Sequence, residues 1–286
     1  MRKHYYIIIP SVILSVILVF MLIPGKSEPT ITYFPPDDEE QFQHATNTLE
    51  LQETDEENNY AVVWENYSKS GNPLYLRQDV SVLYKDGRLI GIKSVWKENS
   101  QTIDFKETFR FKQDHLFQAA TLHYGEKHNE DEDINSLLKM SYSELFVASD
   151  KDEKLPHFQQ PQSEQDTKSK TKLQKRTKEN LLHHWHRLTS HFDIDMAQYE
   201  VVPLTELHQF ENKALLSFTQ EQTDEIIGKL WEGLYKNYII PVSETKDDSS
   251  DSYVPLILFE KHEHDILVLF ELNGEKIKLK QVYPSF

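Results

Sequence analysis

The sequence predicts an α+β protein in which a single N-terminal transmembrane helix is followed by antiparallel β-meanders, each covered by amphipathic helices. Three observations predict this fold class. An uncharged, mainly apolar run occupies residues 5–23. In two later regions apolar and polar residues alternate, which is typical of strands with one buried face. In three other regions apolar residues recur at spacings of three and four, which is typical of helices.

The first residues predict a cytoplasmic tail over residues 1–4 and a transmembrane helix over residues 5–24. At about 1.5 Å per residue, the apolar run approaches the roughly 30 Å of a hydrocarbon core. Arg2 and Lys3 precede it, whereas Lys26 follows it before an acidic stretch. Because basic flanks stay in the cytosol, we expect a single-pass cell-membrane protein whose C-terminal bulk is extracytoplasmic. A cleaved signal peptide is the alternative.

Two polar stretches predict connecting segments. Residues 25–58 combine prolines with acidic clusters and carry too little apolar surface to offset the entropy of ordering. They predict an acidic spacer with a short helix near residues 42–51. Residues 148–170 are rich in Gln, Ser, Asp and Lys, and they predict a linker.

Residues 59–147 predict a β-meander with one covering helix. The alternation indicates four strands, over residues 74–84, about 90–96, 103–111 and 116–124. The first of them places Leu76, Val80, Val82 and Tyr84 on one face. Asp86-Gly87 is a strong signal for a hairpin turn. We expect a sheet with one covered and one solvent-exposed face. The apolar stripe over residues 134–146 predicts the helix that covers it.

Residues 171–286 predict a helical region followed by a three-strand meander. One helix is expected over residues 172–191, and a second after Thr219, where Gln222 completes a capping box. Pro241 is expected to end the second helix. Strands are expected over residues 254–261, 266–272 and 277–282, with a turn at Asn273-Gly274. The pattern leaves open whether the two units form one domain or two.

Composition excludes several kinds of chemistry. The 286 residues include 31 Lys and Arg against 47 Asp and Glu, for a net charge of −16, and no cysteine. Disulfides, thiolate metal sites and cysteine nucleophiles are therefore excluded. No dinucleotide-binding, Walker A or G-x-S-x-G motif is present, so we expect no cofactor and assign no catalytic residue. The acidic charge also argues against nucleic acid as a partner.

These observations favour a non-catalytic binding or regulatory module that acts on a protein partner at the membrane face. The alternative is a membrane-tethered hydrolase of envelope polymer or peptide. That alternative requires histidines near carboxylates, and the sequence offers His123, His128 and the group His183, His184, His186 and His191. The last group lacks the spacing of a zinc site and predicts a solvated helix face.

A second alternative is a calcium-stabilised envelope-binding module. Asp131, Asp133 and Asn135 match the first three ligand positions of an EF-hand loop. Ser136 replaces the turn glycine, however, and Tyr142 replaces the bidentate glutamate. A plain helix start explains the same residues, so the metal site is left unassigned.

A basic stretch stands out in the acidic chain. Residues 168–191 contain seven Lys and Arg and a single acidic residue, Glu179. The candidates for contact with anionic lipid or envelope polymer are Lys172, Lys175, Arg176 and Lys178. The competing interpretation is that they dock on the protein's own acidic segments or face water.

Overall fold

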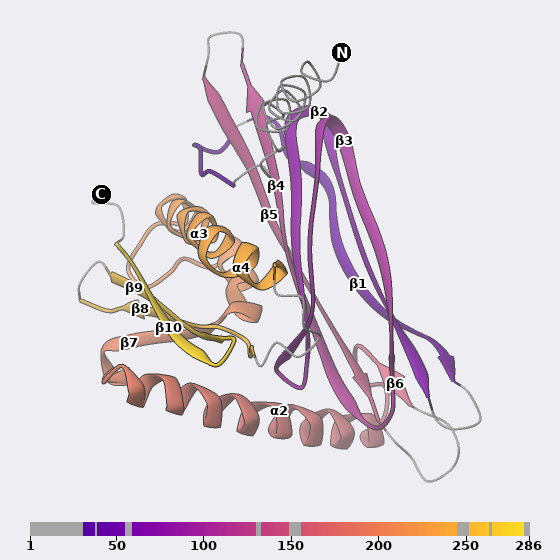
Figure 1. Cartoon of the computed structure of the whole chain (residues 1–286). Coiled ribbons are helices and arrows are strands. Elements are labelled where there is room, and N and C mark those ends of the chain that lie inside the picture. The colour runs from indigo at the N-terminus through magenta and orange to yellow at the C-terminus, as the bar shows by residue number, and fades with distance from the viewer. Residues whose placement is uncertain are drawn as a thin grey trace, which may run out of the picture. The chain divides into compact units, whose positions relative to one another are not determined.

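The computed structural model describes residues 31–37, 39–54, 59–129, 133–148, 156–244, 252–262 and 265–282. Residues Ile31–Phe286 form one compact unit. Within it lie a six-stranded sheet, called sheet A, and a four-stranded sheet, called sheet B (Figure 1). Residues 59–147 and 171–286, for which the sequence leaves open one domain or two, both lie in this unit.

Sheet A is antiparallel and follows the order β1-β2-β4-β5-β6, with β3 paired to the other edge of β2. Its strands are β1 (Phe42–Thr54), β2 (Tyr60–Lys85), β3 (Arg88–Phe111), β4 (His115–His128), β5 (Ile134–Val147) and β6 (His157–Phe158). Asp86 and Gly87 form the predicted turn between β2 and β3, both with positive φ.

The long ribbon of β2 and β3 curls the sheet. The first part of β2 pairs with β1 and its last part with β4, while β3 follows both parts. The register breaks between Lys69 and Leu74, where Gly71 and Pro73 interrupt the ladder. The two parts of β2 consequently face each other, since Asn66 Nδ2 donates to Asp79 Oδ2 at 2.7 Å within the same strand.

The curl buries both faces of the central strands. Val80, Val82 and Tyr84 of β2 lie in the main core outside the curl, whereas Leu83 lies in a second core inside it. Every residue from 76 to 84 is buried. The predicted shared face of Leu76, Val80, Val82 and Tyr84 is confirmed. The expectation that the opposite face meets solvent is wrong here, because the other half of the ribbon folds over it.

Sheet B follows the order β10-β9-β8-β7 and is also antiparallel. Its strands are β7 (Tyr199–Pro203), β8 (Leu256–Glu260), β9 (Asp265–Leu272) and β10 (Glu275–Val282). The predicted three-strand meander corresponds to β8, β9 and β10, and Asn273-Gly274 forms its predicted turn with positive φ at both residues. Strand β7 is not predicted from the sequence, because it is short and contains a proline.

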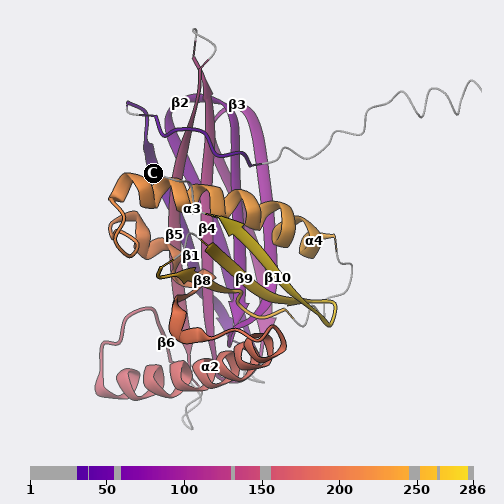
Figure 2. The ribbon, with the colours of Figure 1, turned by 90° about the vertical axis from the view of Figure 1, so that its left-hand side faces the viewer.

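The helices pack against the two sheets (Figure 2). They are α2 (Glu164–His191), α3 (Gln220–Leu234) and α4 (Ile240–Ser243), with 3-10 helices at Met196–Gln198 and Leu204–Glu211 and a π-helical turn at Tyr235–Ile239. The capping box of Thr219 and Gln222 forms as predicted. Pro241 does not end this helical region, because it lies in the first turn of α4, where a missing N–H costs least.

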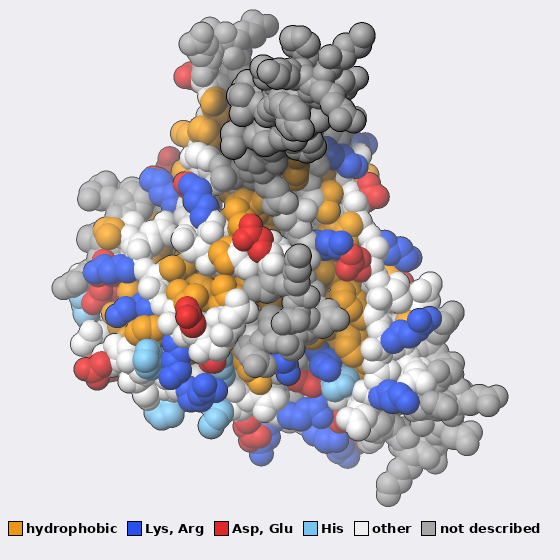
Figure 3. Space-filling view, in the orientation of Figure 1, with side chains coloured by type: hydrophobic (Ala, Val, Ile, Leu, Met, Phe, Trp, Pro, Cys, Tyr) orange, Lys and Arg blue, Asp and Glu red, His pale blue; other side chains and the backbone are white. Residues whose placement is uncertain are grey.

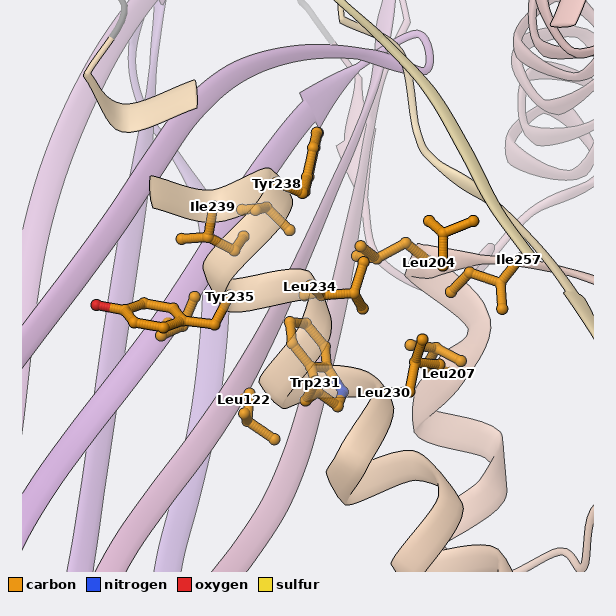
Figure 4. Packing of buried hydrophobic residues seen from close by; sticks show 14 of the residues in the cluster. Leu122, Leu204, Leu207, Leu230, Trp231, Leu234, Tyr235, Tyr238, Ile239 and Ile257 are labelled. Atoms are coloured by element: carbon orange, nitrogen blue, oxygen red, sulfur yellow. The ribbon is translucent and has the colours of Figure 1, made fainter. Parts of the chain in front are cut away.

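Helix α3 packs between the two sheets. Its residues Leu230, Trp231 and Leu234 are almost fully buried in the main core, which also contains Leu122 of β4 and Ile257 of β8 (Figure 4). Helix α2 covers the other face of sheet B through Leu188 and reaches sheet A through Leu173. The predicted amphipathic stripes of both helices are thus buried.

The predicted helix over residues 134–146 is wrong, because this segment is strand β5. It pairs with β4 along its whole length, from Ile134 opposite His128 to Val147 opposite His115. Leu138, Met140 and Tyr142 pack against the main core, and Leu145 lies inside the curl. The same apolar residues fit a helical stripe and a strand buried on two faces, and pairing with β4 decides between them.

The predicted acidic spacer also contains ordered structure. Its expected helix near residues 42–51 is strand β1, which pairs with the first part of β2 and buries Asn47 and Leu49 inside the curl. Local composition gave no sign of this strand, because its stability comes from pairing with a distant segment.

The fold class therefore needs correction from α+β, with meanders covered by helices, to a mostly β fold with a curled sheet. The predicted transmembrane helix over residues 5–24 lies outside the described residues. Across the part of the chain that the structure describes, no helix is both long and apolar enough to cross a membrane.

Candidate functional site

An extended segment of the chain is bound across sheet A beside α3. Ser136 N of β5 donates to Pro35 O at 2.9 Å, and Asp37 N donates to Ser136 O at 3.2 Å. These bonds make a parallel bridge between Pro36 and Ser136. Lys127 of β4 pairs with Asp37 at 2.7 Å. The residues 31–37, which we call the docked segment, therefore bind β5 as an added strand would.

Side chains hold the same segment on α3. Tyr33 N donates to Glu232 Oε2 at 3.2 Å. The Tyr33 ring lies against Gly228, where a Cβ atom would come within 2.2 Å of it. Burial, together with the nearby carboxylates of Glu225 and Asp224, raises the pKa of Tyr33 to about 12. Gly228 thus provides the close approach that this ring needs.

A cleft of about 180 Å³ opens next to the docked segment. Its walls come from β4, β5, α3 and the 3-10 helix Leu204–Glu211, and the docked segment closes one side. Apolar lining residues are Leu122, Leu138, Met140, Phe210, Ile227 and Trp231. Because cofactor and drug-sized sites usually enclose about 300–1,000 Å³, this cleft suits a single side chain.

Carboxylates mark the edge of the cleft. Glu211 forms an ion pair with Lys139 at 2.6 Å and accepts a hydrogen bond from Met140 N. Asp224 accepts a hydrogen bond from Gln220 Nε2 at 2.8 Å. Partial burial, with a smaller contribution from Glu211, raises the pKa of Asp224. The arrangement gives the cleft an apolar floor and a polar rim, which is typical of binding sites.

A second cluster lies inside the curl of sheet A. His123 Nδ1 lies 2.8 Å from Asp79 Oδ2, and His123 Nε2 lies 2.8 Å from Ser141 Oγ. Asp79 and His123 are fully buried. Arg77, also fully buried, lies 3.9 Å from Asp79. We call Asp79, His123 and Ser141 the interior relay.

The other predicted histidines are dispersed. His128 contacts Glu126 and stacks on Tyr75 with ring centroids 3.8 Å apart. His184 is buried 3.8 Å from Glu271, and burial lowers its pKa, partly offset by that carboxylate. His183, His186 and His191 are exposed on α2. Of the histidines that the hydrolase alternative requires, His123 is the one that the structure places in a buried chain with a carboxylate and a hydroxyl.

The residues of the calcium pattern do not converge where the structure describes them. Asp131 lies outside those residues, Asp133 is exposed, and Asn135 Oδ1 accepts a hydrogen bond from Asn129. No group of three or more His, Asp or Glu side chains suited to a metal ion occurs within the described ranges.

The four basic candidates on α2 fall into two groups. In Figure 3 basic and histidine side chains gather along the lower edge, where α2 runs. Lys172 pairs with Asp114 at 3.1 Å, and Arg176 pairs with Asp86 at 3.0 Å and with Asp114 at 3.3 Å. Lys175 pairs along the helix with Glu179 at 3.8 Å, and Lys178 is exposed. Lys172 and Arg176 therefore dock on the protein's own carboxylates.

These contacts predict that the stability lost on replacing Arg176 depends on pH. Burial acts to raise the pKa of Asp86, but hydrogen bonds from His115, Leu116 N and Arg176 lower it overall. A lowered pKa stabilises the fold above the ordinary value of 3.8, and this contribution is lost as the pH falls below it. We expect Arg176→Gln to cost about 1 kcal/mol at pH 7, since the pair is partly screened by solvent, and less at pH 3.

Urea unfolding at both pH values measures this difference. Lys178→Gln is the matched control, and we expect it to change stability by less than about 0.5 kcal/mol. Equal losses for the two variants, or a loss for Arg176→Gln that is the same at both pH values, would contradict the docking of Arg176 on Asp86.

Comparison with known proteins gives no functional guide. No protein-family model and no characterised protein matches the chain. Among solved structures, a β-glucuronidase of Bacteroides uniformis matches with a TM-score of 0.24 and 11% identity, over 36% of this chain and 13% of that one. Bacteroides uniformis β-glucuronidase 2 matches with a TM-score of 0.25 and 12% identity, over 68% and 26%. A protein of Arabidopsis thaliana matches with a TM-score of 0.26 and 9% identity, over 46% and 97%.

Proposed function

We propose that the protein is a binding module that holds an extended segment of a partner protein along β5 and α3, with one apolar side chain in the cleft beside Trp231. The observation that carries this proposal is the docked segment. In this segment the chain's own extended backbone forms hydrogen bonds with Ser136, and its Tyr33 ring packs on Gly228, which supports the proposal that a partner segment lies here in the same way. Added-strand binding of this kind derives affinity from the backbone and specificity from side-chain pockets.

The cleft supplies such a pocket. Met140 and Leu138 of β5 and Ile227 of α3 line it, and its volume fits one side chain. Pro36 of the docked segment also lines it, so a partner segment in the cleft would continue the surface that the docked segment has begun. The regulatory role at the membrane face stays a prediction from the sequence.

Selection from a displayed random-peptide library tests this proposal. We expect the full chain to enrich peptides that share an apolar residue. We also expect a synthetic copy of an enriched peptide to bind the full chain in a fluorescence polarisation assay. Ile227→Phe adds a ring that fills part of the cleft. We expect it to weaken peptide binding at least about tenfold, and a tenfold loss corresponds to about 1.4 kcal/mol. Thermal melting checks that the variant is folded, since overpacking alone costs about 1–3 kcal/mol.

The matched control is Val201→Phe, which adds a ring to an exposed position on β7. It is expected to leave peptide binding unchanged. The proposal is wrong if no peptide is enriched, or if Ile227→Phe and Val201→Phe bind the enriched peptide equally well.

A further inference from the structure

We propose that Ser141 is a nucleophile activated by His123, and that the protein hydrolyses small carboxylic esters at this serine. This inference goes beyond partner binding and concerns a different face of β5. It rests on the geometry of the interior relay, on the proton positions which that geometry fixes, and on the different exposure of its three residues.

The relay is built from three neighbouring strands. Asp79 lies on β2, His123 opposite it on β4, and Ser141 on β5, two residues along from the partner of His123 and therefore on the same face. Their side chains share the inner face of sheet A, and the two hydrogen bonds that His123 makes, with Asp79 and with Ser141, are both 2.8 Å long. A nucleophile, a base and a group that orients the base are thus connected in the order that acyl transfer needs.

The hydrogen-bond partners assign the histidine tautomer. Asn66 Nδ2 donates to Asp79 Oδ2, so this oxygen acts as an acceptor. His123 Nδ1 must then carry the proton and donate to Asp79. In neutral imidazole the other nitrogen is an acceptor, so Nε2 accepts the hydroxyl proton of Ser141. This is the proton arrangement of a serine with its general base.

Burial differs along the relay. Asp79 and His123 are inaccessible to solvent, whereas Ser141 is partly exposed. Low dielectric around the pair strengthens the hydrogen bond between His123 Nδ1 and Asp79 Oδ2. The residue that must meet a substrate is the accessible one. Asp79 acts through His123 and is a positioning residue.

The proposed reaction has two steps. Ser141 Oγ bonds to the ester carbonyl carbon while its proton moves to His123 Nε2, and the bond from that carbon to the alkoxy oxygen breaks. The alcohol leaves with the proton from His123. Water then attacks the acyl group with transfer of one proton to His123 Nε2, and Ser141 Oγ leaves and takes that proton back as the carboxylic acid is released.

Labelling of the full chain with a fluorophosphonate probe tests the inference, because this probe forms a covalent adduct with activated serines. We expect the adduct on Ser141 by peptide mass spectrometry and its absence in Ser141→Ala. The matched control is Ser143→Ala, two residues along on β5 and partly buried like Ser141, which is expected to label like the parent. His123→Gln is expected to slow labelling about 10²–10⁴-fold, the usual contribution of a general base.

Asp79→Asn tests the positioning role, since its amide can donate to Nδ1 and reverse the tautomer. We expect slower labelling at a temperature where circular dichroism shows the variant still folded. The inference is overturned if folded parent protein gives no adduct on Ser141, or if folded His123→Gln or Asp79→Asn labels at the parent rate.

Discussion

Replacing Asp79 by alanine is expected to destabilise the protein by about 3–5 kcal/mol. Asp79 is the carboxylate beside Arg77, with 3.9 Å between Arg77 Nη2 and Asp79 Oδ1, and both side chains are fully buried. Removing one partner of a buried ion pair leaves the other charge without compensation. Asp79→Ala also removes the acceptor for Asn66 and His123. Urea unfolding at neutral pH measures the loss.

A double replacement provides the control for this effect. Arg77→Met with Asp79→Leu removes both charges together, and a pair replaced by apolar residues of similar size often costs little. We expect the double variant to be more stable than Asp79→Ala alone. A loss below about 1 kcal/mol for Asp79→Ala, or a double variant less stable than the single one, would show that the pair is not a buried unit.

Replacing Trp231 by alanine is expected to cost about 3–5 kcal/mol, the usual range for a large aromatic residue in a core. Trp231 is 1% exposed and packs in the core that joins sheet A, sheet B and α3. Its ring nitrogen also contacts Met140 Sδ at 3.3 Å. Because this core holds the two sheets together, we expect the melting temperature to fall with a single transition.

Trp185→Ala is the matched control for Trp231. Trp185 is partly buried on α2, and its Nε1 donates to Val254 O at 2.8 Å. Removing it is expected to cost less than removing Trp231, because part of its surface already meets water. Equal losses, measured by thermal and urea unfolding, would contradict the central place of Trp231 between the sheets.

The sequence predicts local features of the fold and misses those that depend on distant pairing. The capping box at Thr219, the turn at Asp86-Gly87 and the turn at Asn273-Gly274 are encoded by neighbouring residues, and all three form. Strand β5 is different, because its apolar residues fit a helical stripe until β4 pairs with it. Strand β1 is hidden for the same reason in an acidic segment.

Neither candidate site was predictable from single residues. Asp79, His123 and Ser141 come together through the registers of β2, β4 and β5, and no spacing along the chain reveals those registers. The alternation places Asp79 on the face of β2 opposite to that of Val80, and it predicts that this face of the sheet is exposed to solvent. The bend at Gly71 and Pro73 converts that face into an interior. The cleft forms only where α3 packs near β5, and these two segments are also distant from each other in the sequence.

Amide hydrogen exchange of the full chain, with and without a saturating enriched peptide, tests the proposed binding surface most directly. We expect slower exchange in the part of β5 near Ser136 to Met140 and in the part of α3 near Ile227 to Trp231, with exchange in β10 unchanged. Protection centred on β10 or α2, or no change at β5 and α3 in the presence of bound peptide, would contradict it.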